Sequence, residues 1–166
     1  TSDVKEALVG LQGIVCQVSL PPFAEHMGHS LRKLGQLCQG ICITGLASPN
    51  FKAMLNNLCH THSLFSRFTP GGRLQVYPTI SAGNRFFTPT RLATGLQPVS
   101  ISKEVDPHGL LKGTDSKHLI HTDDNEVKYY VISRREDKVR YIPTSPIIFQ
   151  VGDIIEIQVS MVSFPV

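Results

Sequence analysis

Four side chains of the types that bind zinc fall into two close pairs in the first half of the chain. Cys38 and Cys42 form one pair, and Cys59 and His62 form the other. Structural zinc sites hold the metal with four Cys or His ligands in a tetrahedron, and two close pairs often supply them. The sequence favours reduced cysteines in the core, because free Cys is among the most buried residue types, and the expectation is that no cofactor is bound. A zinc site built from these four side chains is the alternative.

Histidine spacings indicate two further kinds of metal site. His26 and His29 lie one helical turn apart, so a single metal ion could bridge them, but the sequence favours solvated side chains because both lie opposite the apolar stripe of Phe23, Met27 and Leu31. His121-Thr122-Asp123 has the His-X-Asp spacing that supplies two ligands of a non-haem iron site, although no histidine follows to supply the third. The alternative is a polar loop in which Asp123 or Asp124 caps a turn.

One group of residues could carry acid–base catalysis, which needs titratable side chains within hydrogen-bond reach of a substrate. The group consists of His108, His118, His121, Asp106, Asp115, Asp123 and Asp124. Motifs of other enzyme classes are absent: the sequence has no G-X-S-X-G nucleophile elbow, no Walker loop and no dinucleotide-binding glycine pattern. A metal-dependent enzyme that uses the histidine-rich loops is an alternative function, but the sequence favours a non-catalytic protein.

Basic and aromatic side chains are interleaved between residues 128 and 141. Bases stack on aromatic rings while Lys and Arg pair with phosphates, so this mixture favours nucleic acid or another anionic polymer as a ligand. The predicted contact residues are Lys128, Tyr130, Arg134, Arg135, Lys138, Arg140 and Tyr141. The alternative is a half-buried hairpin with its tyrosines in the core and a solvated charged turn. Our leading hypothesis is a binding module that uses this segment.

A β-hairpin over residues 128–142, with its turn at 135–138, would position these side chains. After Val151-Gly152-Asp153 a second extended element is predicted, because apolar and polar residues alternate strictly. The apolar set is Ile155, Ile157, Val159 and Met161, and the polar set is Glu156, Gln158 and Ser160. The edge of such a strand can recruit another chain. A protein–protein or self-assembly component, including a homo-oligomer, is therefore the second hypothesis.

Two helices are predicted before these strands. Apolar residues from Phe23 to Ile41 recur at spacings of three and four after Pro21-Pro22, and a second stripe runs from Phe51 to Phe65 after Ser48-Pro49. The expected fold is α+β: two amphipathic helices packed on an antiparallel sheet or an open, barrel-like sheet. A single domain over residues 1–166 is expected, with a helical part at about 22–66 and a β-rich part at about 73–166.

The amino-acid composition limits the classes of partner that are expected. The 166 residues carry a formal net charge of +3, which permits an anionic partner without requiring one. Charged residues make up 17%, against a typical value of about 25%. No apolar run reaches the roughly 18 residues that span a membrane, so no membrane partner is expected. Four cysteines are too few for a secreted disulfide scaffold of this length, which favours an intracellular location, cytoplasmic or nuclear.

The segment from His121 to Tyr130, followed by the segment from Phe149 to Ser160, resembles a block found in uncharacterised proteins of basidiomycete fungi. The likeness is strongest over residues 95–166. It implies a fungal origin and brings no catalytic residues, because no function is assigned to that group.

Overall fold

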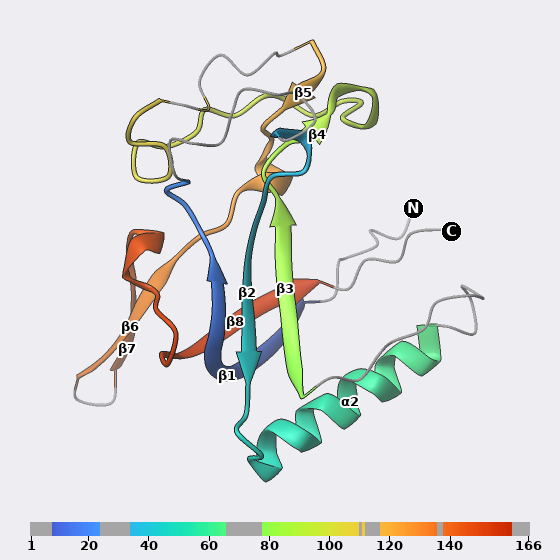
Figure 1. The fold of residues 1–166 in the computed structure, drawn as a ribbon, viewed down its shortest axis with the longest axis vertical. Helices are drawn as coiled ribbons and strands as arrows, with labels where there is room; N and C mark the ends of the chain where they lie inside the picture. Colours follow the sequence, from blue (N-terminus) through green and yellow to red (C-terminus); the bar gives the residue numbers. More distant parts are fainter. Residues whose placement is uncertain are drawn as a thin grey trace. The chain divides into compact units, whose positions relative to one another are not determined.

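The computed structural model describes the chain apart from residues 1–7, 24–33, 66–77, 110, 112–116, 136–137 and 161–166. Strands predominate among the described residues (Figure 1). They are β1 (Leu8–Ser19), β2 (Cys38–Thr44), β3 (Thr79–Arg85), β4 (Thr88–Pro89), β5 (Leu119–Ile120), β6 (Tyr130–Arg135), β7 (Lys138–Pro143) and β8 (Ile154–Ser160). One α-helix, α2 (Pro49–Phe65), is described from end to end, and the short 3-10 helices are η1 (Thr90–Leu92), η2 (Asp123–Asn125) and η3 (Pro146–Ile148). None of the described helices is long and apolar enough to cross a membrane.

The predicted fold of two helices packed on a sheet is wrong. The main element is a four-stranded antiparallel sheet in the order β3-β2-β1-β8. Helix α2 begins at Pro49 as predicted, but Cys38–Ile41, the end of the other predicted helix, opens strand β2 instead. Residues 24–33 of that helix lie outside the described part. Pairing with neighbouring strands makes this segment a strand despite its helical spacing of apolar residues. The β-branched residues Ile41 and Ile43 also favour a strand.

The chain divides into two compact units. Unit 1 contains residues 1–17, 42–82 and 151–166, and unit 2 contains residues 18–41 and 83–150. Strands β1, β2 and β3 each contribute residues to both units. The single domain expected over residues 1–166 stays a prediction.

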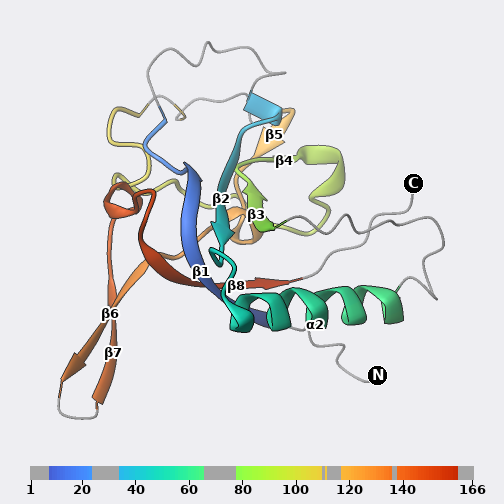
Figure 2. The ribbon, with the colours of Figure 1, turned by 60° about the horizontal axis from the view of Figure 1, so that its bottom comes forward.

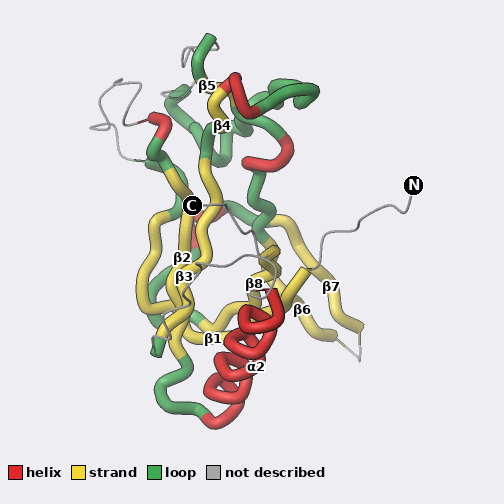
Figure 3. The backbone as a smooth tube through the Cα atoms, turned by 90° about the vertical axis from the view of Figure 1, so that its right-hand side faces the viewer, coloured by secondary structure: helices red, strands yellow, loops and turns green. Residues whose placement is uncertain are grey.

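In unit 1, helix α2 packs on one face of the sheet (Figures 2 and 3). The buried cluster there contains Leu11, Ile43 and Phe51. Strand β8 joins it through its pairing with β1, where Leu11 lies opposite Ile157. Three residues of β8 pack against this cluster, namely Ile155, Ile157 and Val159, while Glu156 and Gln158 are exposed. The alternation predicted for this strand is therefore confirmed as far as the described residues extend, and Met161 lies outside them.

Unit 2 has its own buried cluster and two small sheets. The cluster contains Leu34, Leu37, Phe86, Phe87, Leu111 and Leu119. Strands β4 and β5 pair antiparallel, and strands β6 and β7 form a separate antiparallel hairpin. The hairpin predicted for residues 128–142 is thus confirmed. Its two central turn residues, Glu136 and Asp137, lie outside the described part.

Candidate functional site

The β6–β7 hairpin, called the arm below, is exposed over nearly all of its described residues. Of its twelve described residues, only Ser133 is half-buried, and the rest are exposed. Successive side chains of a strand point to opposite faces, so the strand register divides the arm into two surfaces. The register pairs Ile132 with Tyr141, Ser133 with Arg140, and Arg135 with Lys138.

One surface, the aromatic face, carries both tyrosines of the arm. Tyr130 and Tyr141 contact each other edge to face, with ring centroids 6.3 Å apart and an interplanar angle of 87°. Their exposed fractions are 41% and 60%. Ile132, Val139 and Arg134 lie on the same face by strand parity. This surface therefore offers ring edges and faces together with a single cation.

The other surface, the cationic face, gathers three of the predicted basic residues. Arg135 and Lys138 form the last described pair of the register, and Arg140 is two residues further along β7 on the same side. Like charges directly opposite one another destabilise a sheet. Among the described residues, none of these three cations forms an ion pair with a carboxylate. An anion bound here would relieve their repulsion.

Lys128 and Tyr129 precede the arm and differ from the residues within it. Lys128 Nζ lies 4.0 Å from Glu126 Oε2, an exposed ion pair that partly offsets its charge. Tyr129 donates a hydrogen bond from its hydroxyl to Gln39 Oε1 at 2.9 Å, and burial raises its pKa to about 12. The alternative of core tyrosines therefore holds for Tyr129 but not for Tyr130 or Tyr141.

A buried polar network lies beside Tyr129 in unit 2. Gln39 donates from Nε2 to the carbonyl oxygen of Asn125 at 2.8 Å, and Asn125 donates from Nδ2 to the carbonyl oxygen of Arg85 at 3.1 Å. Tyr129 also accepts, through its carbonyl oxygen, a bond from the amide of Thr144 just beyond β7. No described buried side-chain nitrogen or oxygen lacks a partner. These bonds fix the base of the arm on ordered backbone.

The His121-Thr122-Asp123 segment is a capped turn. Thr122 is the N-cap of η2, and the side-chain oxygen of Asn125 accepts from the Thr122 amide at 2.9 Å. This arrangement is similar to the alternative of a polar loop. The residues that cap the turn, however, are Thr122 and Asn125 and not Asp123 or Asp124. His121 Nδ1 lies 2.8 Å from the carbonyl oxygen of Phe86, to which it donates, and its ring lies beside the Phe86 ring.

The remaining candidate residues for catalysis belong to unit 2. Buried Asp106 accepts a hydrogen bond from the Leu111 amide at 2.9 Å, which closes its own loop. His108 and His118 are exposed, and Asp115 lies outside the described residues. The acid–base cluster stays a prediction.

The four predicted zinc ligands belong to two elements. Exposed Cys38 and half-buried Cys42 are on β2, while half-buried Cys59 and His62 lie one turn apart on α2. Within the described ranges, no group of three or more His, Cys, Asp or Glu side chains could hold a metal ion. His26 and His29 lie outside those ranges. Zinc binding stays a prediction that metal analysis of the purified protein can test.

Sequence reasoning missed a pair of thiols on neighbouring strands. Cys16 on β1 donates from Sγ to the carbonyl oxygen of Cys42 on β2 at 3.3 Å, and Ser81 on β3 donates from Oγ to Cys42 Sγ at 3.5 Å. With residues 22–41 assigned to a helix and Cys42 just beyond it, the pairing of these two strands was not foreseen. The apolar–polar alternation of Gly40–Thr44 was the available signal.

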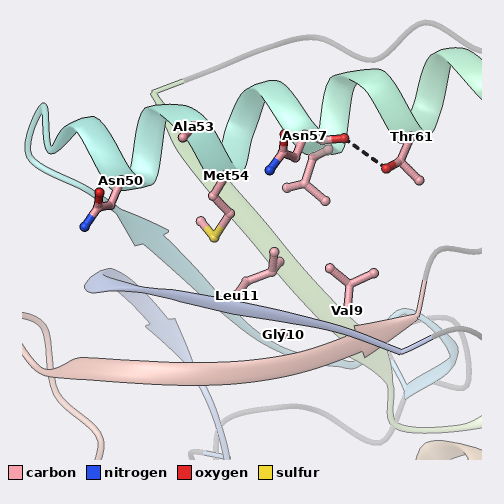
Figure 4. Close-up of a pocket in the computed structure, with 9 residues that line it drawn as sticks. Val9, Gly10, Leu11, Asn50, Ala53, Met54, Asn57 and Thr61 are labelled. Carbon is pink, nitrogen blue, oxygen red and sulfur yellow. Dashed lines mark hydrogen bonds between the residues drawn. The ribbon is translucent and has the colours of Figure 1, made fainter.

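A cavity of about 370 Å³ lies between strand β1 and helix α2 in unit 1 (Figure 4). Val9, Leu11 and Met54 supply apolar walls, and Asn50 and Asn57 supply amide groups. None of the described residues that line it is titratable.

Comparison of the chain with known protein families, with curated proteins and with solved structures finds no match.

Proposed function

We propose that this protein is a non-catalytic binding module whose arm binds a single-stranded nucleic acid. The observation that carries the proposal is the arm register, which gathers Arg135, Lys138 and Arg140 on one exposed surface. Phosphate oxygens would pair with these cations. Bases would stack on Tyr130 and Tyr141, whose rings are exposed on the opposite surface.

The two-sided arrangement favours a single strand over a duplex. A ligand that uses both the cations and the tyrosines has to pass around the edge of a two-stranded ribbon. A single strand is flexible enough to do so, because its bases can be splayed away from its backbone. A duplex is stiff over a site of this size and would meet one face at a time.

Salt dependence of binding tests the cationic face. The probe is a labelled oligonucleotide of about 16 nucleotides in single-stranded form. The test variant combines Arg135→Gln, Lys138→Gln and Arg140→Gln. A matched control removes three exposed cations elsewhere, through Lys52→Gln, Arg91→Gln and Lys103→Gln.

Loss of three phosphate contacts is expected to reduce the slope of log K against log salt by about 2, at about 0.7 per contact. The control variant loses the same net charge and should keep the slope of the unmodified protein. Equal slopes for the two variants, or binding by the unmodified protein that does not weaken with salt, would refute the proposal.

A protein partner, including a second copy of this chain, is the second candidate. Six large apolar residues on the arm are exposed to between 41% and 60%, and exposed apolar patches mark interaction surfaces. They are Tyr130, Val131, Ile132, Val139, Tyr141 and Ile142. Strand β8 also ends the described sheet order, which supports the same candidate.

Light scattering separates the two candidates. Self-association through the arm predicts a concentration-dependent mass that falls when Ile132→Ser and Val139→Ser are introduced together. These side chains are exposed, so the free energy of unfolding should change by less than about 0.5 kcal/mol. A monomer at all concentrations would argue against self-association and would leave the nucleic-acid proposal standing.

A further inference from the structure

The thiols of Cys16 and Cys42 lie on one face of the sheet in unit 1. Leu11 and Ile43 belong to the cluster beneath α2, and strand parity places Cys16 and Cys42 on the opposite face of β1 and β2. Both cysteines are half-buried, so small solutes can reach them. The 3.3 Å bond from Cys16 Sγ to the carbonyl oxygen of Cys42 holds the first thiol against the second residue.

The two thiols have different surroundings. Burial raises the pKa of Cys42, but hydrogen bonds from Ser81, Cys16 and Thr79 together outweigh burial and leave the pKa below its ordinary value. The pKa of Cys16 is raised, first by burial and then by its hydrogen bond and charge interaction with Cys42. The Ser81 hydroxyl donates to Cys42 Sγ at 3.5 Å. Cys42 is therefore the better nucleophile, and Cys16 remains a protonated neighbour.

We propose that Cys42 and Cys16 form a peroxide-responsive thiol pair that closes reversibly into a disulfide between β1 and β2. This site is separate from the arm and does not depend on the nucleic-acid proposal. An accessible thiol with a stabilised thiolate and an adjacent second thiol is the arrangement that redox-sensing cysteines share.

The chemistry proceeds in two balanced steps with hydrogen peroxide as the oxidant. The Cys42 thiolate attacks one peroxide oxygen, the O–O bond breaks, hydroxide leaves, and Cys42 becomes a sulfenic acid. The Cys16 sulfur then attacks the Cys42 sulfur, the S–O bond breaks, and the sulfenic oxygen leaves as water with the Cys16 proton. A dithiol reductant returns both thiols by exchange and is itself oxidised to a disulfide.

Mass spectrometry of the reduced protein after treatment with one equivalent of hydrogen peroxide tests the pair. The expected product has lost two hydrogen atoms and yields a cross-linked peptide that joins Cys16 to Cys42. With Cys16→Ser, a sulfenic acid should accumulate on Cys42 and react with dimedone. With Cys42→Ser, Cys16 should remain a thiol.

Two further variants separate a positioned pair from general thiol oxidation. Loss of the Ser81 hydrogen bond in Ser81→Ala should slow alkylation of the Cys42 thiolate, because removal of this donor raises the pKa of Cys42. The same change at exposed Ser100 should leave the rate unchanged. Oxidation of Cys38 or Cys59 before Cys42, or a product without the Cys16–Cys42 link, would overturn the proposal.

Discussion

The glycine at position 45 lets the chain pass directly against Phe51 at the start of α2. A Cβ at this position would overlap the Phe51 side chain, which is part of the buried cluster of unit 1. We expect Gly45→Ala to lower the free energy of unfolding by about 1–3 kcal/mol, the usual cost of overpacking a core. Chemical denaturation measures the change. Gly10→Ala on β1 is the control, because an added Cβ there meets only Glu156 Oε1 at 3.8 Å.

The hydroxyl of Tyr129 should make the free energy of unfolding fall as the pH becomes alkaline. Its pKa is raised to about 12 in the folded state, against about 10 for a solvated phenol. The folded chain therefore holds this proton more tightly than the unfolded chain does. The resulting stability is present below about pH 10 and is lost as the pH rises through about 12.

Tyr129→Phe should remove the part of the stability loss at alkaline pH that comes from this hydroxyl. Denaturation curves at neutral and alkaline pH measure the free energy of unfolding of both proteins. At neutral pH the variant should lose about 1 kcal/mol, because Gln39 Oε1 loses its donor. A variant whose alkaline loss matches that of the unmodified protein would show that Tyr129 is not the titrating group.

Two neighbouring tyrosines show how far the surroundings of a single side chain can be predicted from the sequence. Tyr129 and Tyr130 are the same residue type in the same segment, yet one is bonded to Gln39 and the other is exposed. The difference depends on a partner ninety residues away in sequence, which no local pattern contains. The two faces of the arm could be predicted from the sequence, because the pairing of Arg135 with Lys138 fixes which residues of the two strands share a face.

Strand β2 illustrates the same limit for elements. The periodicities of α2, of the arm and of β8 are strong, and each of these elements was predicted. Cys38–Ile41 follows helical spacing equally well, and only its neighbours in the sheet make it a strand. The thiol pair was missed for that reason.

A disulfide between strands β1 and β2 should stabilise the protein. It would close a loop between residues 26 apart in sequence, for which loop-closure entropy gives about 3.5 kcal/mol. The Tm of the peroxide-treated chain should therefore exceed that of the reduced chain by about 7–14 °C. Calorimetry with and without a dithiol reductant measures the difference, and Cys16→Ser should melt at one temperature under both conditions.

At the scale of the whole molecule, three strands run from one compact unit into the other. Melting of these strands in one unit removes ordered backbone from the other, so we expect both units to unfold together. Helical circular dichroism follows α2 in unit 1. Tyrosine fluorescence follows mainly unit 2, which holds Tyr129, Tyr130 and Tyr141, and the chain has no tryptophan.

The two signals should share one midpoint, and Gly45→Ala should shift both by the same amount. A tyrosine transition that stays in place while the helical signal moves would show that the units melt independently.

The exposed arm also concentrates the bonds that trypsin cleaves, at Arg134, Arg135, Lys138 and Arg140. Any molecule seated on either surface of the ribbon would shield those bonds from the protease. The rate of the first cut would then report occupancy for ligands of any chemistry, without a label.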